Sequence, residues 1–576
     1  MRTLWKLAAV GLALDLACTV AWSDEIDDHI KSLKRTDYGS LWDKVDATKA
    51  LGTDNSVRAV DALMIAAADD MPAVREAAAL ALARIRDDAA RKVIYLHATK
   101  DKNALVREVM VWSMRLDKDK SEDAIKVYLA ALVELSADVR AQAARAVSAL
   151  GIKAAGDIVM KRLRDVDPDT AAEMALAAAS LGLAEAVEPL AKIAAMGPVL
   201  ARAGAIEALA TLDPAKFGEV VERATKDSSP EVRMGAGYGL LALAATPDAA
   251  FDHAVRLVGD KDWRVRVGGL EVLVAIRQER CVTPIIEQFA KEKGRLRYDM
   301  GEALEDLTGR ELGHDVKPWK AWWDAAGAEF KLPPKAKKGK KKVAKGDAAE
   351  DGSIAKFFGI PIFSQGVVFC VDFSGSMRNE LTKGSFAQAD KKATKLEVAM
   401  DQLEQALGAL APDQRFSGVN LSTEALAQKK RFLSKTLLAA SRSTKAQALE
   451  VFKDVDRTLA KIQRGRGDFY DSLVQGANEI DGMDTYMLIS DGKPTDGQFV
   501  DRENFLPEWT RFNKYRRLML HTILVGGSSF DRNFMRDLAE GTGGVFLDAT
   551  GEDKDDDKPR RDGDKKDGAK KDGANK

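Results

Sequence analysis

The sequence predicts an all-α helical repeat solenoid followed by a doubly wound α/β domain. A short pattern centred on a Val-Arg pair recurs every 30 to 33 residues through the first half of the chain. After residue 354, short apolar runs alternate with helical patterns, which is typical of a parallel sheet covered by helices on both faces. A lysine-rich segment separates these two regions.

Length and composition allow several folded units. The chain has 576 residues, of which 46% are hydrophobic, and a formal net charge of -1. This balance gives no global attraction to nucleic acid, and we expect none as a partner. The three cysteines (Cys18, Cys281 and Cys370) are too few for a disulfide framework or a Cys-rich metal site, and no two of the five histidines have metal-ligand spacing.

Residues 1–23 have the pattern of a secretory signal peptide. A basic start precedes the mostly apolar stretch 7–22, and Ala21-Trp22-Ser23 matches a small-x-small cleavage site. Cys18 leaves a lipidated alternative open, although Asp15 stands where a lipobox has an aliphatic residue. We therefore predict an exported protein, periplasmic or otherwise extracytoplasmic, or secreted. No later stretch of about 18 apolar residues predicts a membrane span.

The repeats are defined by one anchor position in each unit. Their spacing of 30 to 33 residues is typical of a solenoid. The anchors are Val74, Val106, Val139, Thr170, Leu200, Val232, Val265 and Leu296, most of them followed by arginine.

Each anchor is expected to open a helix. From Val139 the apolar positions advance in steps of four, four and three residues, which is a helical period. Prolines precede several anchors, as at Pro72 and Pro230, where the first turn of a helix tolerates them. Small residues one step after the anchor would let neighbouring helices approach closely. A second apolar segment between anchors, such as 124–135, makes each unit a helix pair.

This pattern resembles HEAT repeats, in particular the short repeats of the phycobilisome-lyase-like group. Tetratricopeptide repeats have a similar period, but their Trp, Leu-Gly and Tyr pattern is absent. The resemblance covers about residues 40–305, within a predicted solenoid of 24–326. It implies a surface that binds protein partners, without identifying them.

A tryptophan-rich segment follows the last repeat. It runs from Leu307 to Trp323 and includes Trp319 and Trp322. We expect a capping helix whose rings cover the end of the repeat core, because terminal repeats need a cover. An exposed aromatic binding patch is the alternative.

Two segments have the composition of disordered chain. Residues 327–353 form a linker rich in lysine, which cannot bury a core. Residues 551–576 form a low-complexity tail of Asp, Lys, Arg and Gly.

The region 354–550 predicts an α/β domain. A buried strand at 367–371 is followed by a helix at about 393–410. Further strands are expected at 416–421, 486–489, 518–525 and 545–547.

A cluster of oxygen-bearing residues follows two of these strands. Asp372, Ser374 and Ser376 form a D-x-S-x-S pattern directly after the first strand, and Asp491 with Gly492 ends a later one. This combination resembles the metal-ion-dependent adhesion site (MIDAS) of von Willebrand factor A domains. The resemblance implies that these four residues hold a divalent cation, whose open position accepts a carboxylate of a partner protein.

The chemistry is sensible without the resemblance. Hard cations such as Mg²⁺, or Mn²⁺ or Ca²⁺, take oxygen ligands. Alternate residues of one loop can direct their oxygens to one point at the carboxyl end of a strand, where open α/β sheets bind ligands.

The sequence departs from the family at one ligand. The family supplies a threonine from a loop of the form G-G-T-N-x-Y-D, and Gly467 takes its place when the chain is aligned on Tyr470 and Asp471. We predict weaker or altered metal binding. A water or the Asp468 carboxylate would replace the missing hydroxyl.

These patterns favour a binding protein over an enzyme. No Walker A, H-E-x-x-H or G-x-S-x-G pattern and no Cys/His nucleophile pairing is present. The alternatives are a metal-independent scaffold, a subunit of a larger assembly such as one with an AAA-type ATPase, and a metal-dependent hydrolase.

Overall fold

The computed structural model describes residues 25–36, 41–244, 247–327, 329–334, 354–381, 393–422, 431–460, 466–495, 497, 499–500 and 502–550. The predicted signal peptide (1–23), most of the predicted linker and the predicted tail (551–576) lie outside these residues.

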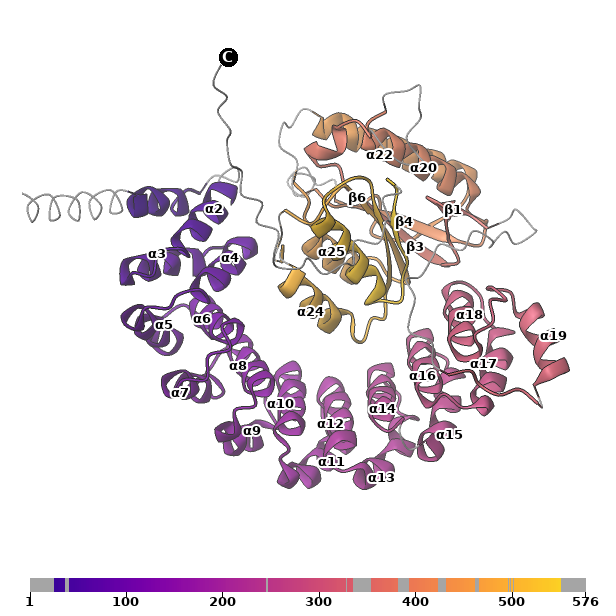
Figure 1. Ribbon diagram of the computed structural model, residues 1–576, viewed down its shortest axis with the longest axis horizontal. Coiled ribbons are helices and arrows are strands. Elements are labelled where there is room, and N and C mark those ends of the chain that lie inside the picture. Colours follow the sequence, from indigo (N-terminus) through magenta and orange to yellow (C-terminus); the bar gives the residue numbers. More distant parts are fainter. Residues whose placement is uncertain are drawn as a thin grey trace, which may run out of the picture.

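The first half of the chain is a curved array of helices (Figure 1). A helix over residues 25–33 precedes it. The array continues with α2 (Leu41–Leu51), α3 (Val57–Ala67), α4 (Pro72–Leu82), α5 (Asp88–Lys100), α6 (Ala104–Leu116), α7 (Glu122–Ala131), α8 (Ala137–Leu150), α9 (Gly156–Arg162), α10 (Pro168–Leu181), α11 (Val187–Met196), α12 (Val199–Leu212), α13 (Pro214–Ala224), α14 (Pro230–Ala242), α15 (Pro247–Val258), α16 (Trp263–Ile276), α17 (Val282–Phe289), α18 (Arg295–Thr308) and α19 (Val316–Ala326).

The helices form two layers. The even-numbered helices from α2 to α18 pack each against the next and line the concave side, while α5, α7, α11, α13, α15 and α17 belong to the outer layer (Figure 1). The predicted helix pairs are confirmed, and every anchor from Val74 to Leu296 lies in a concave-side helix. The prolines begin helices as expected, for example Pro72 in α4 and Pro230 in α14.

Small residues after the anchors permit close helix packing. A Cβ atom on Gly204 of α12 would lie 2.9 Å from Ala172 Cα of α10. A Cβ on Gly269 of α16 would lie 2.4 Å from the backbone nitrogen of Val258. Larger side chains cannot occupy these positions without moving the neighbouring helix, because protein interiors are close-packed.

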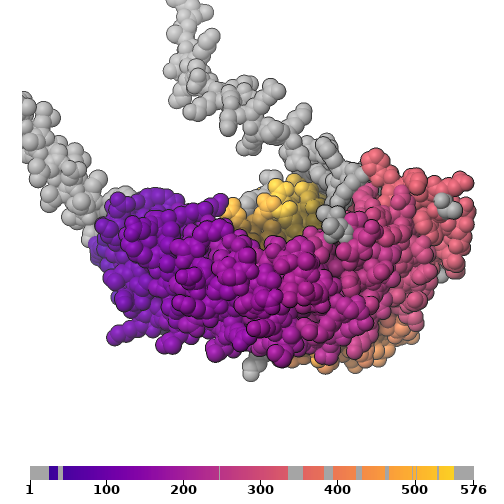
Figure 2. Space-filling model, turned by 90° about the horizontal axis from the view of Figure 1, so that it is seen from below, coloured from indigo at the N-terminus to yellow at the C-terminus, as the bar shows by residue number. Residues whose placement is uncertain are grey.

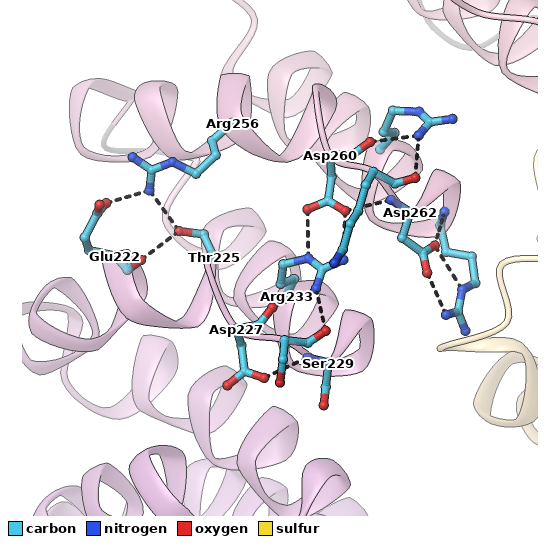
Figure 3. A network of polar contacts seen from close by, with 12 residues as sticks. Glu222, Thr225, Asp227, Ser229, Arg233, Arg256, Asp260 and Asp262 are labelled. Carbon is cyan, nitrogen blue, oxygen red and sulfur yellow. Dashed lines mark hydrogen bonds and ion pairs between the residues drawn. The ribbon is translucent and has the colours of Figure 1, made fainter.

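The arginine that follows an anchor valine connects neighbouring repeats through its hydrogen bonds. Arg233 donates from Nε and Nη2 to both carboxylate oxygens of Asp260 in the next repeat, at 2.7 and 2.8 Å (Figure 3). Its Nη1 donates to the carbonyls of Asp227 and Ser228, before its own helix. Arg140 makes the same set of contacts with Asp165 and two preceding carbonyls. Each arginine therefore joins the turn of its own repeat to the next repeat.

The second apolar segment of one repeat, 124–135, extends beyond its helix. Helix α7 ends at Ala131. Leu135 lies in the following turn with 95% of its surface exposed. Its apolar character is therefore not explained by a core position.

The predicted cap is present. Helix α19 packs on α17, and Trp319 is fully buried, with its Nε1 donating to the Gly313 carbonyl at 2.7 Å. Trp322 and Trp323 are partly buried, and both pack edge-on against Phe330. These contacts favour the capping role over an exposed aromatic patch.

The second region is a six-stranded sheet between helices. Its order is β5-β4-β3-β6-β7-β8, with all neighbours parallel except the short edge strand β5. The strands are β3 (Gly366–Val371), β4 (Arg415–Asn420), β5 (Leu438–Ala439), β6 (Thr485–Ser490), β7 (Met519–Leu524) and β8 (Phe546–Asp548). The five predicted strands are confirmed. Strand β5 and the hairpin of β1 (Lys356–Phe357) with β2 (Ile360–Pro361) were not anticipated.

Helices cover both faces of this sheet. Side chains of α20 (Lys395–Ala409) and α22 (Arg442–Leu459) share a core with Phe369, Met487 and Ile523 of the strands. On the other face, α23 (Tyr470–Glu479), α24 (Arg502–Asn513) and α25 (Ser529–Glu540) pack against Cys370, Leu488 and neighbouring residues. This second core is continuous with that of the solenoid.

The α/β region lies in the hollow of the solenoid (Figures 1 and 2). Helix α24 and the segment up to Leu518 face the concave-side helices. The polar contacts join Glu76, Glu207, Tyr238, Arg264, Glu271 and Arg295 of the solenoid to residues 484–517. The concave surface of the solenoid is thus already in contact with the chain's own second region.

Within the described part of the chain, no helix combines the length and apolar character needed to cross a membrane.

Candidate metal centre

The predicted ligands lie at the carboxyl ends of two adjacent strands. Strands β3 and β6 are parallel neighbours, with Val371 level with Ile489. The chain leaves β3 toward β4 on one side and reaches β6 on the other, so the strand order reverses between them. Open α/β sheets bind ligands at this kind of switch point. Asp372 follows β3 and Asp491 follows β6, which brings the two carboxylates to the same edge.

Asp372 is buried and oriented by three hydrogen bonds. Only 3% of its surface is exposed. Its Oδ1 accepts from the Ser374 backbone N–H at 2.8 Å, and its Oδ2 accepts from the Ser490 hydroxyl at 2.6 Å. Its own N–H donates to the Ile489 carbonyl at 3.1 Å. The carboxylate is therefore held rigidly where β3 and β6 meet.

The two serines connect Asp372 to Asp491. The hydroxyl oxygens of Ser374 and Ser376 lie 3.1 Å apart. The Ser376 hydroxyl then donates to Asp491 Oδ1 at 2.8 Å. Four of the five predicted ligand residues are thus brought together, and they present carboxylate and hydroxyl oxygens, the ligand type that hard divalent cations take.

The Asp372 carboxyl group is buried beside a second carboxylate, that of Asp491. Burial, and then the neighbouring Asp491 carboxylate, raise the pKa of Asp372 to about 6. Hydrogen bonds from Ser490 and Ser374 act in the opposite direction and only partly offset this rise. A divalent cation held by this cluster would offset the repulsion, so the residues present fit such an ion.

A lysine that the sequence did not single out neighbours the cluster. Lys395 begins α20, next to a capping box formed by Thr394 and Glu397. Its Nζ lies 2.6 Å from Asp491 Oδ2, and both side chains are largely buried. A lysine at a helix start carries no signal for such a role, and only the packing of α20 against the sheet edge reveals it.

Asp468 has a different partner from the one predicted. Its Oδ2 accepts hydrogen bonds from Nη1 and Nη2 of Arg431 at 3.0 Å, and both residues are buried. Its Oδ1 accepts from the Asp471 N–H. This pairing gives the prediction of Asp468 as a metal ligand no support, because ligation would compete with a buried ion pair.

Gly467 occupies the place where the family threonine was expected. A Cβ atom on Gly467 would lie 3.6 Å from Asp372 Oδ2, so a hydroxyl carried there would reach the cluster. The Gly467 N–H donates instead to the Thr495 hydroxyl at 3.2 Å, and the Thr495 N–H donates to the Gly467 carbonyl at 2.9 Å. The contact of Thr495 with Gly467 was not predicted from the sequence, because Thr495 lies in the loop after β6 and not in the loop that contains Gly467.

Other candidate sites are less defined. Within the described ranges, no three or more His, Cys, Asp or Glu side chains gather as a metal-binding group. A cavity of about 760 Å³ lies between α16 and α18 of the solenoid and the segment around α24, lined among others by Tyr238, Glu271, Arg295 and Arg517. None of the predicted ligands lines it.

Comparison with known proteins supports the HEAT-repeat prediction for the first half of the chain. A family model described as HEAT repeats matches residues 42–115. A search of curated proteins finds no match. The N-terminal part is accordingly a HEAT-like helical solenoid, and it is followed by an α/β region with a mostly parallel sheet.

Several solved structures share similarity with this chain. An engineered protein is 19% identical over 53% of this chain and 93% of its own, with a TM-score of 0.28. A phycocyanin lyase complex of CpcE and CpcF from Nostoc sp. is 17% identical over 46% of this chain and 94% of its own, with a TM-score of 0.26. An importin beta is 12% identical over 49% of this chain and 47% of its own, with a TM-score of 0.30.

Proposed function

We propose that this protein is an exported, non-enzymatic scaffold whose α/β domain binds a protein partner through a divalent cation. The observation that carries the proposal is the continuous run of oxygens from Asp372 through Ser374 and Ser376 to Asp491, at the switch point of the sheet. These residues would hold Mg²⁺, Mn²⁺ or Ca²⁺. When bound, such an ion offers an exchangeable position that a partner carboxylate can fill.

We further infer that the α/β domain is of the von Willebrand factor A type. The doubly wound order β5-β4-β3-β6-β7-β8, with an antiparallel edge strand, supports this assignment. The D-x-S-x-S pattern directly after β3 also supports it, as does Asp491 directly after β6. Gly467 in place of threonine predicts a weaker site than the complete motif.

The solenoid would supply a second protein-binding surface. Its concave side faces the α/β region, so an outside partner would use another face. Large apolar side chains stand four residues before the anchor in three consecutive repeats, and the same position is polar in the flanking repeats (Asp70, Lys102, Ser228 and Lys261). These exposed side chains are Leu135 at 95%, Val166 at 93% and Met196 at 84%. Exposed apolar groups that recur in this way favour a protein contact.

Export rests on the signal-peptide pattern of residues 1–23. Comparing the N-terminal sequence of the mature protein from envelope fractions with that of the full chain tests it directly. A protein that is found in the cytosolic fraction and still carries residues 1–23 would contradict export.

Cation-dependent binding of a protein partner is tested by affinity capture. Wild-type protein and Asp372→Ala are used as baits in envelope extracts, with and without EDTA. We expect a partner that is retained by the wild type with Mg²⁺ and lost both with EDTA and with Asp372→Ala. Titration calorimetry with Mg²⁺ and Mn²⁺ on the same two proteins should show cation uptake by the wild type only. A wild type that takes up no divalent cation would refute the proposed mechanism.

A further inference from the structure

The loop that follows Asp491 ends on the solenoid. It leads from β6 into α24, and its Val500 N–H donates to Glu76 Oε2 of α4 at 2.8 Å. The Asn504 side-chain amide in α24 donates to Glu76 Oε1 at 3.1 Å. Glu76 has no exposed surface. Both oxygens of a buried solenoid carboxylate are therefore bonded to the segment that carries Asp491.

Aromatic contacts join the same loop both to α6 of the solenoid and to α23 of the α/β region. The ring of Phe499 lies edge-on to Trp112 of α6 at 5.7 Å and edge-on to Tyr470 at 4.5 Å. Tyr470 is the first residue of α23 and closely follows Gly467 and Asp468. Phe499 is thus packed between the solenoid and the segment on which the missing ligand was expected.

The described residues in the middle of the loop are tied to neighbouring segments. Thr495 exchanges two hydrogen bonds with the Gly467 backbone. Gly497 has a positive φ of 97°, and a Cβ there would lie 2.2 Å from Asp468 Oδ1, so no larger residue fits. The Lys493 N–H is held by Asp531 Oδ1 at 3.1 Å. These contacts connect the described residues between Lys493 and Val500 to the segments around the cluster.

We propose that Glu76 and Trp112 are positioning residues for the cation site, and that the first solenoid repeats hold the loop of Asp491 in its binding geometry. A buried carboxylate is stable only while its hydrogen bonds are made, so Glu76 and the loop favour the docked arrangement together. Because coupling between sites is reciprocal, cation binding also strengthens docking of the loop on α4 and α6. This inference rests on the proposed cation site.

The interface provides a matched control. Glu207 of α12 pairs with Lys514 at 2.6 Å, in the same interface but beyond the C-terminal end of α24. Glu207→Ala and Glu76→Ala each remove one solenoid carboxylate from the interface, but only Glu76 contacts the segment next to Asp491. General loosening of the interface would affect both variants, whereas positioning of the loop would affect only Glu76→Ala.

The experiment measures Mg²⁺ and Mn²⁺ affinity of the full-length chain by calorimetry. Glu76→Ala should weaken affinity at least about fivefold, the lower end of typical coupling, while Glu207→Ala leaves it unchanged. Trp112→Leu, which keeps an apolar side chain, should weaken affinity in the same direction and serves if Glu76→Ala does not fold. Unchanged affinity in folded Glu76→Ala or Trp112→Leu, or an equal loss in Glu207→Ala, would overturn the coupling.

Hydrogen exchange separates this inference from the proposed function. Without metal, peptides covering 491–504 should exchange faster in Glu76→Ala than in the wild type, and Mg²⁺ should slow exchange there in the wild type. A wild type that binds no cation overturns the proposed function and the coupling with it. Normal cation uptake, with exchange and affinity both unaltered by Glu76→Ala, overturns the coupling alone.

Discussion

The solenoid repeats one polar contact from unit to unit, whereas the candidate metal centre is assembled once. Arg140 and Arg233 make equivalent bonds to a carboxylate in the following repeat and to carbonyls before their own helix. The candidate metal centre instead depends on single residues from two strand ends. In repeat arrays stability is approximately a sum over units and their interfaces, while a single site has no second copy to compensate for a loss. Substitutions should therefore separate into those that change stability and those that change cation affinity.

The largest effect is expected in the solenoid. Arg233→Ala leaves the Asp260 carboxylate without its buried bidentate partner and should cost about 3–5 kcal/mol of unfolding free energy. Denaturant unfolding measures this loss, and Mg²⁺ affinity should stay unchanged. The control is Arg256→Ala. Arg256 pairs with Glu222 in the neighbouring contact (Figure 3), but both side chains are substantially exposed, so the loss of unfolding free energy should be much smaller. Equal costs for the two variants would contradict the distinction.

A hydroxyl at position 467 should strengthen the site. Gly467→Thr places an additional oxygen near Asp372, and we expect roughly tenfold tighter Mg²⁺ binding by calorimetry, the value of one added interaction of about 1.4 kcal/mol. Gly467→Val has the same shape without the hydroxyl and should give no gain. Either residue must displace the Phe469 ring slightly, since a Cβ would lie 3.1 Å from it. Unchanged affinity in Gly467→Thr would refute the assignment of this position.

Removal of the neighbouring lysine should also raise cation affinity. The Lys395 ammonium group is paired with Asp491 Oδ2 and repels a second cation at the same carboxylate. In Lys395→Met this like charge is removed, and Mg²⁺ affinity should rise about fivefold, which corresponds to about 1 kcal/mol. Weaker binding in this variant would show instead that Lys395 positions Asp491.

The smallest effect is a dependence on pH. Since the pKa of Asp372 is raised to about 6, protons compete for this ligand as the pH falls through that value. Affinity for Mg²⁺ should therefore be about fourfold weaker at pH 5.5 than at pH 7.5, the ratio of ionised fractions for a pKa near 6. Asp372→Asn should bind weakly with no such pH dependence. Equal affinity of the wild type at both pH values would contradict the prediction.

Much of the architecture was predictable because its signals are local. A spacing of 30 to 33 residues can be read along the chain, and the apolar face of each helix follows from its own residues. The strands were found for the same reason. The cluster of Asp372, Ser374, Ser376 and Asp491 was also predictable from the sequence, because parallel strands end at one edge of a sheet and bring their following residues together.

The contacts that the sequence did not reveal involve partners that are distant in sequence. Asp468, which stays a predicted ligand, pairs with Arg431, 37 residues away. Lys395 meets Asp491 across 96 residues. Leu135, in the apolar segment 124–135, lies after the end of α7 and is exposed, which periodicity cannot distinguish from a core position.

The sequence by itself determined a helical repeat array, a parallel α/β sheet and the cluster of oxygen-bearing side chains at the sheet edge, since each depends on short-range patterns. Only the tertiary structure decided that α24 lies in the hollow of the solenoid and that Glu76 holds Val500, 424 residues further along the chain. Such contacts depend on the curvature accumulated over many repeats and on the shape of a second domain. No local pattern encodes either of these, because both arise from packing summed over the whole molecule.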